Sequence, residues 1–196
     1  MKPMLENKEN DEDYIDYSQR AVVGSVWTAS LMMGVGAFNE DVKLMVLAGL
    51  IGLIAGAFSK AIREYSWVSS QLDIELAQIK GDNVANKNQE AKSAKKVKLQ
   101  NPIKAAGASA IAFSLGAMVP LLAAAAAAAI RDHNVRLGVV AGATSLALLG
   151  FGGLGAVLRK VPLLNSSLRV LVGGWMAMAI TFGLTKLIGT SINRKF

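Results

Sequence analysis

Five long runs without a charged residue constrain the fold of this chain more than any other feature. The runs are 21–38, 44–59, 105–130, 137–158 and 170–185. A helix needs roughly 17–25 apolar residues to cross a hydrocarbon core of about 30 Å. Three runs are long enough. The second and fifth become so when Lys60 and Lys186 are counted as helix-end residues whose ammonium groups reach the membrane surface. The runs predict an all-α integral membrane protein with five transmembrane helices.

A soluble helical bundle does not fit this composition. Apolar residues make up 53% of the 196 residues and charged residues only 18%. Helices that are apolar on all sides would have no polar face to present to water. We therefore expect a membrane domain over residues 21–190, with spans at about 21–38, 42–66, 103–130, 135–158 and 168–188.

The positive charge of the chain is distributed asymmetrically. With five spans, the side that holds the N-terminus carries 14 of the 21 Lys and Arg residues, and the opposite side carries 6. Basic residues accumulate on the cytoplasmic side of membrane proteins. The net charge of +7 is thus a topology signal. We expect a cytoplasmic N-terminus, the lipid bilayer as the principal partner, and no nucleic acid.

The segments outside the spans are polar. Residues 1–20 are acidic and show no apolar period, which predicts a disordered cytoplasmic tail and excludes a secretory signal peptide. Apolar residues at helical spacing continue beyond the second span. We therefore expect a cytoplasmic helix extension and a basic linker over residues 67–102, and a luminal tail over 191–196.

Small residues recur at helical spacing in two spans. Gly52 and Gly56 form one GxxxG pair, and Gly138 and Gly142 form another. Such pairs let helices approach closely in lipid and are consistent with a homodimer contact. They also arise easily in a chain with 19 glycines.

Catalytic chemistry has little support in the sequence. The chain has no cysteine, and its single histidine, His133, has only Asp132 as an acidic neighbour in a short polar turn. Phosphate-binding, zinc-protease and dinucleotide motifs are absent. We expect no enzyme activity and no cofactor.

Lys60, Arg63 and Glu64 form a charged cluster at the end of the second span. The Glu64 carboxylate is an oxygen ligand suited to a divalent cation. Lys60 precedes it by four residues, so the two side chains could pair on one helix face. Alternatively, all three side chains simply reach water at the membrane surface.

Several sequence runs resemble the vacuolar iron transporter family, in particular its nodulin-like plant members. They are "TASLMMGVG" from Thr28, "LAGLIGLIAGAFSKAIREY" from Leu47, and "RVLVGGWMAMAITFGLTKLIG" from Arg169. The resemblance covers about residues 14–190. It implies a homodimer of five-helix subunits in the vacuole membrane that moves ferrous iron, and in some members manganese, from the cytosol into the vacuole. Such a protein contributes to iron homeostasis.

The chain departs from the family pattern where the ion would pass. The family carries an Asn-Asp-Gly stretch at the start of the first span, and this chain continues from Gly24-Ser25 to Val26-Trp27 without it. Lys60 stands at the position of the family's methionine, and Arg63 at that of a glycine. Glu64 is retained, and the resemblance implies that it is a metal ligand. Two hypotheses follow: an iron transporter, or a family member without transport that acts as a dimer partner or structural membrane subunit.

Overall fold

The computed structural model describes residues 2–85, 101–130, 132–159 and 162–193, and all the regular structure in them is helical. The helices are α1 (Lys2–Phe38), α2 (Val42–Ala85), α3 (Pro102–Ala126), a short 3₁₀ turn η2 (Ala127–Ala129), α4 (His133–Leu158) and α5 (Leu163–Asn193). Each of α1 to α5 contains a segment long and apolar enough to cross a membrane. The predicted all-α architecture of five spans is confirmed.

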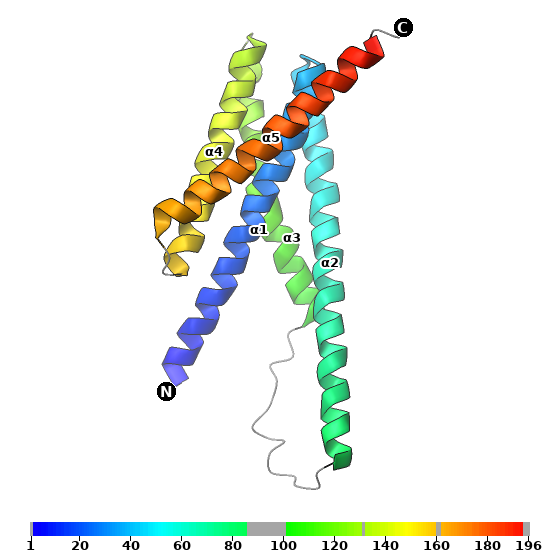
Figure 1. Cartoon of the computed structure of the whole chain (residues 1–196), viewed down its shortest axis with the longest axis vertical. Helices are drawn as coiled ribbons and strands as arrows, with labels where there is room; N and C mark the ends of the chain where they lie inside the picture. Colours follow the sequence, from blue (N-terminus) through cyan, green and yellow to red (C-terminus); the bar gives the residue numbers. More distant parts are fainter. Residues whose placement is uncertain (1, 86–100, 131, 160–161, 194–196) are drawn as a thin grey trace.

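The helices alternate in direction, so that the chain ends and the connections divide between two ends of the bundle. Figure 1 shows the N-terminus, the Ala85 end of α2 and the start of α3 toward one end, while the α1–α2 turn and the C-terminal end of α5 lie toward the other. α2 is the longest helix, with 44 residues, and its last part projects beyond the bundle.

α1 is the central helix of the bundle. It contacts each of the other four helices, whereas α2 packs mainly on α1 and α3, and α5 on α1 and α4. Within the structure, 44% of the most apolar window of α1 is buried, against 11% for α5. α5 therefore lies at the periphery, where it crosses α1 and α4 obliquely (Figure 1).

Side-chain caps explain where several helices begin. The Asp41 carboxylate accepts a hydrogen bond from the backbone N–H of Lys43 at 2.9 Å, at the start of α2. Asn101 and Asp132 cap α3 and α4 in the same way, each through a bond of 3.1 Å to the N–H two residues later. These oxygens satisfy backbone donors that have no partner within the helix.

The apolar core lies where α1, α2, α3 and α4 meet. A cluster of buried side chains joins the four helices: Met32, Met45, Leu121, Ala124, Leu137 and Val140. This core holds α1 and α2 in a fixed relation in the half of the bundle away from the N-terminus (Figure 1). Arg20 of α1 and Glu64 of α2 lie toward the opposite end.

The expectation of a disordered tail over residues 1–20 was wrong. α1 begins at Lys2 and runs without interruption to Phe38. The only proline in this segment is Pro3, in the first turn, where its missing N–H breaks no helical hydrogen bond. Ser18 is buried against Gly155 of α4, and Arg20 contacts α2. Tertiary contacts thus anchor a segment whose composition alone is that of a solvated tail. The predicted basic linker falls largely on 86–100, and the predicted luminal tail largely on 194–196, outside the described residues.

Candidate metal site

Glu64 lies near the end of the membrane-crossing part of α2. It follows Val42, the first residue of the helix, by 22 positions, which at 1.5 Å per residue places it about 33 Å along the axis. The hydrocarbon core is about 30 Å thick. The carboxylate is therefore at a membrane boundary, where an ion entering from water would first meet the protein.

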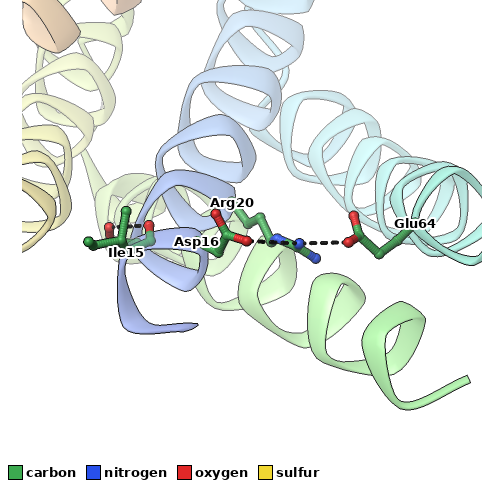
Figure 2. A network of polar contacts seen from close by, with 5 residues as sticks. Ile15, Asp16, Arg20 and Glu64 are labelled. Atoms are coloured by element: carbon green, nitrogen blue, oxygen red, sulfur yellow. Dashed lines mark hydrogen bonds and ion pairs between the residues drawn. The ribbon is translucent and has the colours of Figure 1, made fainter. Parts of the chain in front are cut away.

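The Glu64 carboxylate forms an ion pair with an arginine from α1. Arg20 Nη2 donates a hydrogen bond to Glu64 Oε1 at 2.9 Å, and the two residues are 44 positions apart in the chain. The side chains are 22% and 13% exposed. Figure 2 shows the Arg20 guanidinium between α1 and α2, directed at Glu64. Among the described residues, this is the ion pair that joins two different helices.

The pairing of Lys60 with Glu64, which their spacing on one helix allows, is not formed. The ion pairs of the described residues involve Arg20 with Glu64 and with Asp16, but not Lys60. Lys60 is half-buried on α2. A guanidinium from the neighbouring helix offers several fixed donors to a carboxylate, and α1 brings one within direct reach of Glu64.

A cleft of about 300 Å³ surrounds this ion pair. It is lined by residues of α1 and α2: Asp16, Arg20, Arg63, Glu64 and Trp67. Asp16 is 67% exposed and lies 3.7 Å from Arg20 Nη2. The cleft is more polar than two other large hollows among the described residues, which are lined mostly by apolar side chains.

Glu64 is not part of a preformed metal cage. No group of three or more His, Asp or Glu side chains suited to a metal ion occurs in the described residues. Asp73 and Glu75, farther along α2, are exposed and half-exposed. The cleft therefore offers a divalent cation two carboxylates, those of Glu64 and Asp16, and the ion would keep water in most of its other positions.

The part of α1 where the family resemblance implies an aspartate is packed tightly against α3. Ser25 is fully buried, and its hydroxyl donates a hydrogen bond of 2.8 Å to the backbone carbonyl of Gly116. Thr28, one turn later, is also fully buried, and its hydroxyl has no partner in the described structure. These hydroxyls are neutral, so this part of α1 carries no charge that could offset the desolvation of an ion.

His133 takes part in a structural contact at the start of α4. The Arg136 guanidinium contacts His133 Nδ1 at 3.2 Å and donates a hydrogen bond to the backbone carbonyl of Glu40 at 2.7 Å. Arg136 is buried at the start of α4. This contact ties the α1–α2 turn to α4 and lies at the far end of the bundle from Glu64.

Comparison with known proteins shows the family to which this chain belongs. The sequence model of the VIT family matches residues 21–99 and 83–186. The chain belongs to the VIT family. It is 53% identical to "Vacuolar iron transporter homolog 1" of Arabidopsis thaliana over 95% of this chain and 93% of that protein. It is 47% identical to "VIT-like transporter 1b" of Glycine max over 92% of this chain and 82% of that protein. It is 48% identical to "Vacuolar iron transporter homolog 5" of Oryza sativa subsp. japonica over 86% of this chain and 76% of that protein.

In this VIT family member, Glu64 is predicted from the sequence as a candidate ligand, but its partner Arg20 and the neighbouring Asp16 are not. Both had been assigned to a disordered tail. One signal was present in the sequence: Asp16 and Arg20 are four residues apart, the spacing of ion pairs on a helix, and they precede the first span on the same side as Glu64.

Proposed function

We propose that this membrane protein moves ferrous iron, and manganese as a second substrate, from the cytosol into the vacuole and so contributes to iron homeostasis. The observation that carries the proposal is the Glu64 carboxylate in a polar cleft midway along α2, the longest helix described. The names of its relatives in Arabidopsis and rice refer to vacuolar iron transport. A transport role rather than catalysis also fits a chain made almost wholly of apolar membrane helices.

Glu64 is the proposed metal ligand at the cytosolic entrance. Ferrous iron and manganese accept carboxylate and water oxygens, and the cleft is lined by Asp16 and Arg20 from the N-terminal half of α1. The side that holds the N-terminus carries the excess of Lys and Arg, which supports a cytosolic orientation. No cofactor is part of this proposal, because the iron is the cargo.

A homodimer is part of the same proposal, and α4 offers a surface for it. No described atom lies within 4 Å of a Cβ built on Gly138 or Gly142. These two glycines leave a smooth strip on the outer face of α4, where a second helix can approach closely in lipid. The other GxxxG pair is used within the chain, because Gly52 packs against Leu31 and Gly56 against the ring of Phe113.

A second candidate function has a specific observation in its favour. Arg20 neutralises Glu64 at 2.9 Å, and Lys60 stands where the family has a soft thioether. At 4 Å and an effective dielectric of 20, each unit charge repels another of the same sign by about 4 kcal/mol, and a divalent ion by twice that. With these positive charges where the metal ion would enter, the chain could act as a dimer partner or structural subunit that does not transport metal.

Uptake by vesicles that contain the purified protein separates the two candidates. We expect ferrous iron to enter vesicles with the parent chain and the rate to fall at least tenfold for Glu64→Gln. Glu40→Gln removes an exposed carboxylate at the opposite end of the bundle and should leave the rate unchanged. Absence of uptake in the parent chain would favour the non-transporting subunit.

A further inference from the structure

Arg20 lies between two carboxylates, and one of its nitrogens reaches both. Nη2 is 2.9 Å from Glu64 Oε1 on α2 and 3.7 Å from Asp16 Oδ2 on its own helix. Figure 2 shows the three side chains in one line, with the guanidinium in the middle. A small rotation of the Arg20 side chain would exchange one partner for the other without any movement of the backbone.

The two partners differ in their environment. Glu64 is 13% exposed and Asp16 is 67% exposed. A guanidinium held by Glu64 cancels the charge of the more buried carboxylate, and one held by Asp16 leaves that charge free. A divalent cation gains from Glu64 only in the second arrangement, since the paired carboxylate attracts it no more than a neutral group would.

The other charges near the cleft make it more important which of the two carboxylates holds the Arg20 guanidinium. Arg63 lines the cleft, and Lys60 lies one turn before Glu64 on α2. With Arg20 they place three cations near the two acids Asp16 and Glu64. Removal of the Arg20 charge from Glu64 is thus the change that most improves the site for a cation.

We propose that Arg20 competes with the transported cation for Glu64, and that Asp16 accepts the Arg20 guanidinium when the cation binds. Arg20 and Asp16 are then positioning residues that set how strongly the entrance holds a divalent ion. This inference rests on the proposed function, because it assumes that Glu64 is a metal ligand.

Trp67 lines the same cleft and provides a local readout of binding. The chain has two other tryptophans, Trp27 and Trp175, and replacing both with Phe leaves Trp67 as the only one. Paramagnetic Mn²⁺ quenches tryptophan fluorescence at short range. The probe is therefore Mn²⁺, titrated onto the purified full chain in phosphatidylcholine nanodiscs, which carry no net lipid charge.

Arg20→Gln should lower the Mn²⁺ concentration for half-maximal quenching roughly fivefold or more, since about 1 kcal/mol of ion pairing no longer opposes the metal. Arg20→Lys keeps a cation and should bind Mn²⁺ much like the parent. Arg169→Gln removes an exposed arginine at the start of α5 and serves as the matched control. A variant whose fold is merely damaged would not bind Mn²⁺ more tightly than the parent.

Asp16→Asn removes the alternative partner and should weaken Mn²⁺ binding about twofold to threefold in the parent chain. In the Arg20→Gln background, Asp16→Asn should not change Mn²⁺ binding, because the Asp16 carboxylate then has no guanidinium to accept. This double-mutant cycle separates an acceptor from a direct ligand.

Three results would overturn the inference. If Arg20→Gln leaves Mn²⁺ affinity unchanged while Glu64→Gln abolishes quenching, the metal site stands and the competition by Arg20 is wrong. If Asp16→Asn weakens binding equally in both backgrounds, Asp16 is itself a ligand and not an acceptor. If no variant, including Arg20→Gln, shows quenching, the proposed metal site at Glu64 fails and the inference fails with it.

Discussion

Gly24 of α1 and Gly116 of α3 lie against each other's helix backbone at a close helix crossing. A Cβ on Gly24 would collide with the carbonyl oxygen of Phe113, and one on Gly116 with that of Ala21. The neighbouring Ser25 hydroxyl donates to the Gly116 carbonyl at 2.8 Å, so the crossing combines close contact with a buried hydrogen bond. Small residues at such positions are what allow helices to pack in lipid, where no hydrophobic driving force joins them.

The first prediction concerns the stability of this crossing. Gly116→Ala should lower the free energy of unfolding by about 1–3 kcal/mol, because the backbone of α1 must move away from the new methyl group. Thermal unfolding of the purified protein in detergent measures the effect. Gly107→Ala is the control on the same helix, because nothing lies within 4 Å of a Cβ there. It should leave the stability unchanged or raise it by up to about 1 kcal/mol. Equal loss in both variants would show that the crossing is not the cause.

The second prediction separates the two GxxxG pairs. Gly142→Leu, on the open face of α4, should reduce the fraction of dimer detected by cross-linking in membranes and leave the unfolding temperature of the subunit nearly unchanged. Gly56→Leu should do the reverse, since its side chain would meet the Phe113 ring inside the subunit. Dimer loss with Gly56→Leu but not with Gly142→Leu would contradict this assignment.

The third prediction concerns Lys60. Lys60→Met supplies the thioether that the family resemblance implies at this position, but Arg20 still neutralises Glu64, and α1 still lacks the aspartate that the same resemblance implies. We expect the single change to leave ferrous iron uptake within about twofold of the parent. Combined with Arg20→Gln, it should raise uptake of ferrous iron more than that of magnesium, because a soft sulfur ligand favours iron. A large iron-selective gain from Lys60→Met alone would show that Arg20 and the missing aspartate are not the limiting features.

The fourth prediction tests the orientation in the membrane. The chain has no cysteine, so single cysteines at the exposed positions Asn165 and Glu40 can be labelled without background. In intact vacuoles, a membrane-impermeant maleimide should label Asn165→Cys, at the α4–α5 end, and should label Glu40→Cys only after permeabilisation. The opposite pattern would reverse the proposed topology.

The sequence by itself determined the five membrane spans, because the length of an uncharged run and the thickness of a bilayer are compared without knowledge of the fold. It also singled out Glu64 as a carboxylate at a span end, which is a local property too. It did not determine that residues 2–20 form helix, since Ser18 and Arg20 are anchored by residues of α4 and α2 that are far away in the chain.

The tertiary structure alone decided the partner of Glu64. Spacing on one helix allowed Lys60, four residues away, as a partner, whereas the ion pair is made by Arg20, 44 residues away. It likewise decided that Gly52 and Gly56 pack inside the subunit while Gly138 and Gly142 remain open. Periodicity shows which residues share a helix face, but the neighbour of that face depends on how the helices pack. Here α1 supplies Arg20 and Leu31, and α3 supplies Phe113.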